Sequence, residues 1–191
     1  MRQILSQFNW FDIFALIIIC RISYVALKTG FTTEIFKLLG IIFATYLALH
    51  YFSTLSEFVH CRLGLKIISL VLLDLLAFIF LVLIGVVIFV FLRLTFLRFL
   101  KMEAVPHLQR WGGFVLGFIR SFFVIGLISF LFVAFNLTYL ERGVRLSYSG
   151  GQFFALAPRC YKWIWNNLTS KFMTQEKYNP SISQIVEGFK K

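Results

Sequence analysis

The sequence predicts an all-α polytopic membrane protein with about four transmembrane helices and a short amphipathic interfacial helix toward the C-terminus. Three observations support this class: 60% of the 191 residues are hydrophobic, only 14% are charged, and the apolar residues are clustered in long runs. An ordinary soluble domain is roughly half apolar and about a quarter charged. Because apolar runs of about 18 residues or more are typical of membrane spans, we expect a helix bundle whose outer surface is covered by lipid.

Four apolar runs have the length of a membrane span, and we expect them roughly at 8–27, 31–52, 67–92 and 112–137. At about 1.5 Å per residue, each covers the roughly 30 Å hydrocarbon layer. The third run contains Asp74. One Asp costs about 3 kcal/mol at the centre of a span, less than the Leu, Ile, Val and Phe residues around it contribute, so this run is expected to insert as well.

A change of composition after the fourth run divides the chain. Residues 1–145 are expected to form the four-span membrane domain, 146–172 an interfacial amphipathic segment and 173–191 a polar tail. In the middle part, Trp163 and Trp165 stand near lysines. Tryptophan beside lysine is typical of the headgroup boundary, so these two residues are predicted to be interfacial anchors.

The charge and the motif content exclude several function classes. Nineteen Lys and Arg against eight Asp and Glu give a net charge of +11, and most of the basic residues fall in loops and tail. We therefore expect contact with anionic lipid headgroups and none with nucleic acid. The histidines look isolated, the three cysteines lack ligand spacing, and no nucleophile or phosphate-loop motif occurs. No catalytic residue, metal or cofactor is predicted.

Small residues repeat every four positions in two of the runs. The second run has Gly40, Ala44 and Ala48, and the fourth has Gly113, Gly117 and Ser121. Residues at this spacing share one helix face, and small residues let two backbones approach closely in a membrane. We predict that both stripes are packing faces, within the bundle or between copies. Scatter of common small residues is the alternative.

Four ionisable residues lie inside apolar runs: Asp12, Arg21, Asp74 and Arg120. A charge in hydrocarbon is costly, so such residues face the bundle interior, pair, or extend to the interface. One interpretation is a water-filled or protonatable polar path. The other is that Arg21 and Arg120 reach the headgroups and that Asp12 sits at the interface. Direct Asp–Arg pairing would have to bridge roughly 10 Å of depth.

Several residues at or near the starts of the spans form short motifs in a fixed order along the chain. They are Trp10 and Asp12, then Gly30, Phe31, Glu34 and Gly40, then Leu108, Gln109 and Arg110, followed by Gly113, Gly117, Arg120 and Ser121. In this order and placement the chain resembles the colicin V production protein family. It departs from the family pattern at Lys28, Gln109 and Ser121. Only Gln109 removes a carboxylate, which bears on any role that needs one beside Arg110.

The resemblance implies a multi-pass protein of the bacterial inner membrane, with both termini outside. It also implies an association with colicin V-like toxin production or export, or with envelope homeostasis. Together with the small-residue stripes and the lack of a catalytic motif, it leads us to expect a non-enzymatic role through helix–helix contacts with envelope proteins or a second copy. The alternative is a subunit of an oligomeric channel or transporter that uses the buried Asp and Arg residues.

Overall fold

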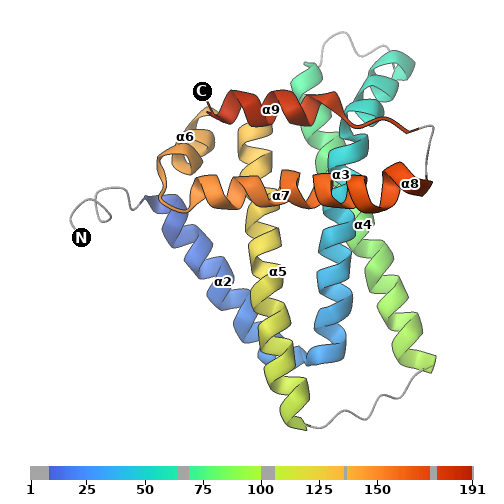
Figure 1. The fold of residues 1–191 in the computed structure, drawn as a ribbon, viewed down its shortest axis with the longest axis vertical. Helices are drawn as coiled ribbons and strands as arrows, with labels where there is room; N and C mark the ends of the chain where they lie inside the picture. The colour runs from blue at the N-terminus through green and yellow to red at the C-terminus, as the bar shows by residue number, and fades with distance from the viewer. Residues whose placement is uncertain (1–8, 64–68, 100–105, 136, 173–175, 191) are drawn as a thin grey trace.

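Four long helices form the body of the molecule in a computed structural model that describes residues 9–63, 69–99, 106–135, 137–172 and 176–190 (Figure 1). They are α2 (Trp10–Thr29), α3 (Phe31–Leu63), α4 (Leu70–Phe99) and α5 (Pro106–Ala134). All four are long and apolar enough to cross a membrane, and successive helices run in opposite directions. Within the described ranges every regular element is helical, which confirms the predicted all-α, four-span class.

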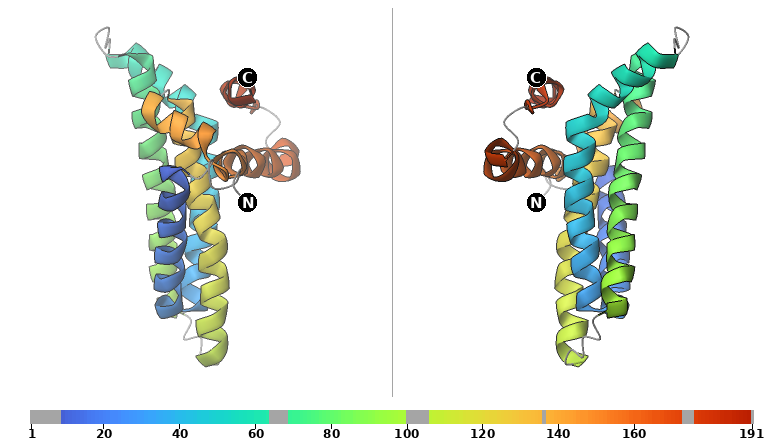
Figure 2. Two further views of the ribbon diagram at one scale, coloured as in Figure 1. Left: turned by 90° about the vertical axis from the view of Figure 1, so that its left-hand side faces the viewer. Right: turned by 90° about the vertical axis from the view of Figure 1, so that its right-hand side faces the viewer.

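The remaining elements lie beside one end of this bundle. They are α6 (Thr138–Leu146), α7 (Gly150–Ile164), a π-helical turn η1 (Trp165–Thr169), α8 (Ser170–Phe172) and α9 (Pro180–Lys190). α7 crosses in front of α5 and α3, nearly perpendicular to them, at the level where α2 begins (Figures 1 and 2). Since α2 has 20 residues, it covers about 30 Å, the thickness of the hydrocarbon layer. α7 therefore lies where an interfacial helix is expected.

The four spans pack in an open order. α3 and α5 contact each other in the middle, α4 packs mainly on α3, and α2 packs mainly on α5. The apolar core is concentrated toward the end that carries α7. There Phe52, Phe78, Phe130 and Phe135 form an aromatic cluster that α7 extends with Phe154. α4 and α2 each keep an outward apolar face for lipid.

Two boundaries differ from the sequence expectation. α3 has 33 residues instead of ending near residue 52. At about 1.5 Å per residue it is longer than the hydrocarbon layer and continues past the level of α7. The expected polar tail contains α9, whose apolar residues Ile182, Ile185 and Phe189 recur at helical spacing. Ile182 is fully buried, and Phe189 stacks on Phe154 with 4.2 Å between ring centroids.

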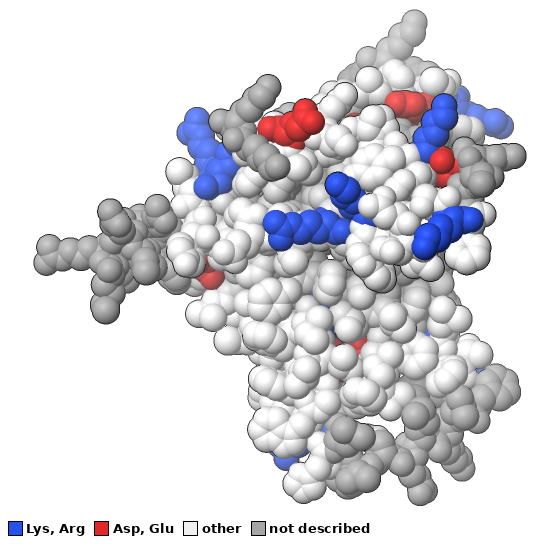
Figure 3. Space-filling view, viewed as in Figure 1, with Lys and Arg blue, Asp and Glu red and all other residues white. Residues whose placement is uncertain are grey.

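Charge is distributed unevenly along the bundle axis. Lys and Arg gather over α6 to α9, whereas the belt below them is almost uncharged on this face (Figure 3). Arg159, Lys162 and Lys171 are exposed in this upper region. An uncharged belt beside a basic rim is the pattern of a protein that crosses hydrocarbon and meets headgroups at its edge.

Candidate functional site

A fully buried carboxylate lies inside the bundle at the start of α3. Gly30 separates α2 from α3 in a single residue with φ of 81°, a conformation that favours glycine. This tight turn places Glu34, 0% exposed, one turn into α3. Lys37 Nζ lies 2.7 Å from Glu34 Oε1, and Arg120 Nη2 of α5 lies 3.2 Å from Oε2. Two cations from two helices therefore neutralise one carboxylate inside the helix bundle.

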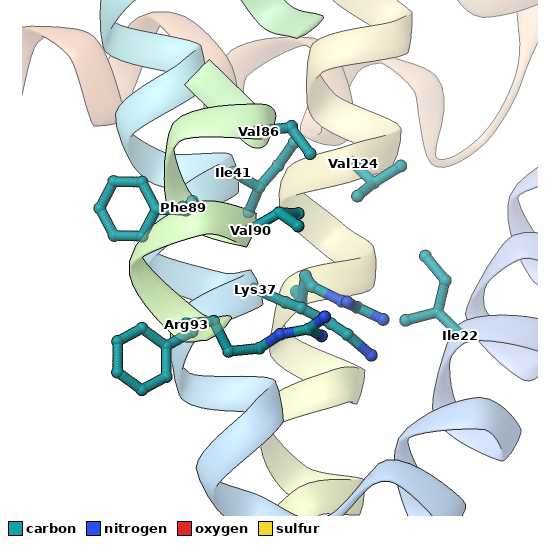
Figure 4. A pocket seen from close by; sticks show the side chains of 11 residues that line it. Ile22, Lys37, Ile41, Val86, Phe89, Val90, Arg93 and Val124 are labelled. Atoms are coloured by element: carbon teal, nitrogen blue, oxygen red, sulfur yellow. The ribbon is translucent and has the colours of Figure 1, made fainter. Parts of the chain in front are cut away.

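A cavity of about 390 Å³ adjoins this cluster. Its inner surface comes from α3 and α5, with Ile22 of α2 on one side and residues of α4 on the other. Figure 4 shows Arg93 of α4 and Lys37 of α3 with their charged ends directed toward the same region. Most of the other lining residues are apolar: Phe36, Ile41, Val86, Phe89, Val90 and Val124.

Positive charge dominates at this cavity. Lys37, Arg93 and Arg120 line it, and Glu34 is the one carboxylate paired with any of them among the described residues. The described cluster thus carries three positive charges and one negative charge, a net charge of +2. The Nε atoms of Arg93 and Arg120 are buried and have no hydrogen-bond partner in the part of the chain that the structure describes. A buried N–H group without an acceptor is costly, and Arg93 has no carboxylate partner in the described ranges, so this arrangement favours an anion.

Asp12 lies at the other end of the bundle and not at the cavity. It completes a capping box at the start of α2, where its carboxylate accepts the backbone N–H of Asn9 at 3.0 Å. The same side chain accepts the backbone N–H of Ser149 at 3.1 Å and the Ser149 hydroxyl. Asp12 therefore joins the first span to the turn between α6 and α7.

Replacing Asp12 by Ala is expected to lower the free energy of unfolding by about 1–2 kcal/mol, because a capping interaction and the bonds to Ser149 are lost together. SDS titration of the protein in mixed micelles measures this change. Asp12→Asn, which retains one carbonyl acceptor, should lose less. Equal stability of Asp12→Ala and the wild type would contradict this role.

The other two intramembrane candidates have different environments. Asp74 of α4 accepts a hydrogen bond from the Ser56 hydroxyl of α3, near the end of the bundle that carries α7. Arg21 is exposed on α2, and the structure gives its side chain no ion pair or hydrogen bond within the described ranges. Of the four candidates, only Arg120 lies at the cavity.

The small-residue stripes lie at helix contacts inside the bundle. A Cβ added at Gly117 would lie 2.2 Å from Ala26 Cβ of α2, and one at Gly113 would lie 2.8 Å from the Ala26 carbonyl oxygen. On the other side, Gly40 meets Phe89, and Ala44 meets Gly85 of α4. The last members of the stripes, Ala48 and Ser121, are both fully buried.

A comparison with protein-family models gives a match to this chain. The family model described as colicin V production protein matches residues 11–175. The chain belongs to the colicin V production protein family. No curated protein and no solved structure gives a significant match to the chain.

Two stretches that carry the resemblance to the colicin V production family meet in space. A Cβ added at Gly112 would lie 2.7 Å from the Phe31 ring, and one at Gly30 would lie 3.3 Å from Gln109 Oε1. The turn before α3 and the start of α5 are therefore in contact, and the Glu34–Arg120 ion pair joins the same two helices. Arg110 is exposed, and the side chain of Leu108 lies outside the described residues.

The remaining predicted residues lie at the end that carries α7. The Trp10 ring lies against Gly143 of α6, where an added Cβ would approach to 2.3 Å. Trp163 is 63% exposed, as an interfacial anchor would be. Trp165 instead packs inward, with its ring 5.5 Å from that of His50 and 5.9 Å from that of Tyr178.

A second polar network surrounds His50, which looks isolated in the sequence. Nε2 of His50 is bonded to the Glu176 carboxylate, and Nδ1 lies 2.9 Å from the Tyr161 hydroxyl. Because a carboxylate only accepts, Nε2 is the protonated nitrogen. Asn179 donates from its side chain to the Leu49 carbonyl at 2.9 Å. These bonds connect the segment before α9 to the middle of α3, at a sequence separation that no local pattern reveals.

This network predicts a pH dependence. The hydrogen bond from His50 is the main cause that holds the pKa of Glu176 below its usual value of 4.5. Burial is the next-largest effect and opposes it, and the hydrogen bond from Tyr51 adds to the lowering. A lowered pKa means that the stabilisation is complete above pH 4.5 and is lost as the pH falls below it. Since the side chain is 33% exposed, solvent weakens the effect. Trp165 fluorescence should therefore change on acidification below that pH, and Glu176→Gln should abolish this change.

Proposed function

We propose that this protein is a non-enzymatic component of the bacterial inner membrane that supports production or export of a colicin V-like toxin, or envelope homeostasis. It acts through helix–helix contacts with another envelope protein or with a second copy of itself. Membership of the colicin V production family supports the general role. The described residues contain no group of three metal-ligating side chains.

The observation that carries the contact proposal is the environment of Arg21. This arginine is exposed on α2, eight residues before Thr29 at the end of the helix, and it has no partner among the described residues. Its Cα lies about 12 Å from that helix end. An arginine at the centre of a span costs about 2.5–3.5 kcal/mol on insertion scales, and a carboxylate or polar group on a partner helix would reduce that cost.

The small-residue stripes also favour the exposed face of α2 as the place where a partner binds, because the stripes themselves are already covered. α2 already packs against Gly113 and Gly117, and α4 already packs against Gly40 and Ala44. A partner helix therefore has to use an outward face. The exposed face of α2 around Ile17 and Arg21 offers one such surface, with Ile17 61% exposed.

Photo-crosslinking in native membranes tests the contact. A photoreactive residue at Ile17 in a toxin-producing strain should give a discrete crosslinked product. Arg21→Gln should remove most of that product and reduce the toxin in the medium, because the partner then loses its charged contact. Arg98→Gln changes the same charge at an exposed position of α4 and should alter neither. Recovery of monomer alone in the unsubstituted background would contradict the proposal.

The second candidate function is a subunit of an oligomeric channel or transporter. The observation that favours it is the cavity between the four helices, which three cations line. Asp12 and Asp74 do not line that cavity, so a conduction path would rely on Arg120, Arg93 and Lys37 and would select anions. Anion flux into liposomes that contain the purified protein distinguishes this function from the first. Flux abolished by Arg120→Gln would favour the channel.

The basic surface of α6 to α9 is proposed to lie on anionic headgroups. Arg159 and Lys162 are exposed along α7 beside Trp163. Each basic residue near an anionic surface contributes about 1 kcal/mol to membrane association. We further propose that this end faces the outside of the inner membrane, with both termini on that side.

A further inference from the structure

We propose that the cavity beside Glu34 binds an anionic phospholipid, with the phosphate among Lys37, Arg93 and Arg120 and an acyl chain along the apolar wall. Binding a lipid is a property separate from the partner contacts proposed above, since it concerns the cavity between the four helices and not the face of α2 around Arg21.

The charge of the cavity selects an anion. Glu34 forms ion pairs with Lys37 and with Arg120, and the third cation, Arg93, has no carboxylate partner among the described residues. The cluster has a net charge of +2 and contains two buried Nε–H groups without acceptors. A phosphate supplies several acceptor oxygens and a negative charge, and arginine is well suited to it because its donors match phosphate geometry.

The remaining surface of the cavity selects an apolar chain. Val86, Val90 and Phe89 of α4 line one side, and Ile22 of α2 lies on the other. α4 packs mainly on α3 and α2 mainly on α5, so the cavity lies between the two outer helices. The volume of about 390 Å³ lies within the range of small-molecule sites, about 300–1,000 Å³. A free inorganic anion would leave this apolar wall uncovered.

The depth of the cations fits a headgroup. Lys37 is six residues from the start of α3, and Arg93 is six residues from the end of α4. Both Cα atoms therefore lie about 9 Å from the ends of their helices on the same side of the bundle. Long basic side chains at this depth can reach a phosphate at the boundary while the acyl chain extends into the bilayer.

Native mass spectrometry of the full-length protein in mild detergent tests the proposal, with phosphatidylglycerol and phosphatidylcholine of identical acyl chains as probes. The wild type should retain phosphatidylglycerol at least about tenfold better than phosphatidylcholine. Arg93→Gln should reduce phosphatidylglycerol binding about tenfold, the effect of one charge-assisted hydrogen bond. Arg98→Gln, an exposed position on the same helix, should not reduce it.

A steric pair of variants keeps the test valid if Arg93→Gln does not fold. Val90→Trp fills the cavity without changing charge, whereas Val87→Trp adds the same volume at a position of α4 that does not line the cavity. Only Val90→Trp should lose the lipid. Equal retention of both lipids, or equal losses in Arg93→Gln and Arg98→Gln, would overturn the proposal. Thermal stabilisation by inorganic phosphate that requires Arg93, together with equal retention of both lipids, would assign the cavity to a free anion instead.

Discussion

Glu34→Gln is expected to lower the free energy of unfolding by about 3–5 kcal/mol, the usual cost of removing one partner from a buried ion pair. Glu34 is fully buried and forms ion pairs with both Lys37 and Arg120, so the variant leaves two cations unneutralised inside the bundle. SDS titration in mixed micelles measures the change. The amount of protein in native membranes should fall with it.

Glu57→Gln is the matched control, because Glu57 is an exposed carboxylate on the same helix. A double-mutant cycle isolates the ion pair from the rest of the site. Glu34→Gln combined with Arg120→Gln should be more stable than the sum of the two single changes, by about 1–3 kcal/mol. Strict additivity, or a loss no larger than that of Glu57→Gln, would show that the pair does not hold α3 to α5.

Gly117→Leu is expected to destabilise the packing of α2 on α5 by about 3 kcal/mol and to reduce accumulation in the membrane. A Cβ at this position would lie 2.2 Å from Ala26 Cβ, so the two helices must separate before any larger side chain is accommodated. Accumulation in membranes and SDS titration of the purified protein provide the measurement.

A compensating exchange tests the contact itself. Gly117→Ala alone should be destabilising, and Gly117→Ala with Ala26→Gly should recover most of the loss, because the remaining neighbours are at 3.6 Å or more. Gly188→Leu in α9, where an added Cβ meets none of the described atoms within 4 Å, is the control. If the exchange does not recover stability, the effect of Gly117 does not come from its contact with Ala26.

Hydropathy alone was enough to predict the four spans, because insertion depends mainly on the summed transfer free energy of a run. The ends of α3 and α9 were less predictable. α3 continues to Leu63 on residues that are mixed in polarity but remain helical. The stripe of Ile182, Ile185 and Phe189 has the spacing of one helix face, so the sequence itself carries a signal for α9.

The polar sites could be predicted only in part. Arg120 was recognised as an intramembrane charge, but its partner is Glu34 and not an aspartate. The depth of the two residues in the membrane was a usable signal for this pair, since Glu34 lies in the first turn of its span, on the side toward which Arg120 lies. The sequence does not show which helix faces face each other, because the rotation of each helix about its axis depends on packing. The bond between His50 and Glu176 joins residues 126 positions apart and needed the fold to be found.

The most direct test of the four-span arrangement is the labelling of introduced cysteines by a membrane-impermeant maleimide on sealed, oriented vesicles. Cysteines at Ser183 in α9 and at Arg98 in α4, each placed singly in a background without Cys20, Cys61 and Cys160, report the two ends of the bundle. One of these positions should react with intact vesicles and the other only after permeabilisation. Reaction of both positions from the same side would contradict a bundle that crosses the bilayer.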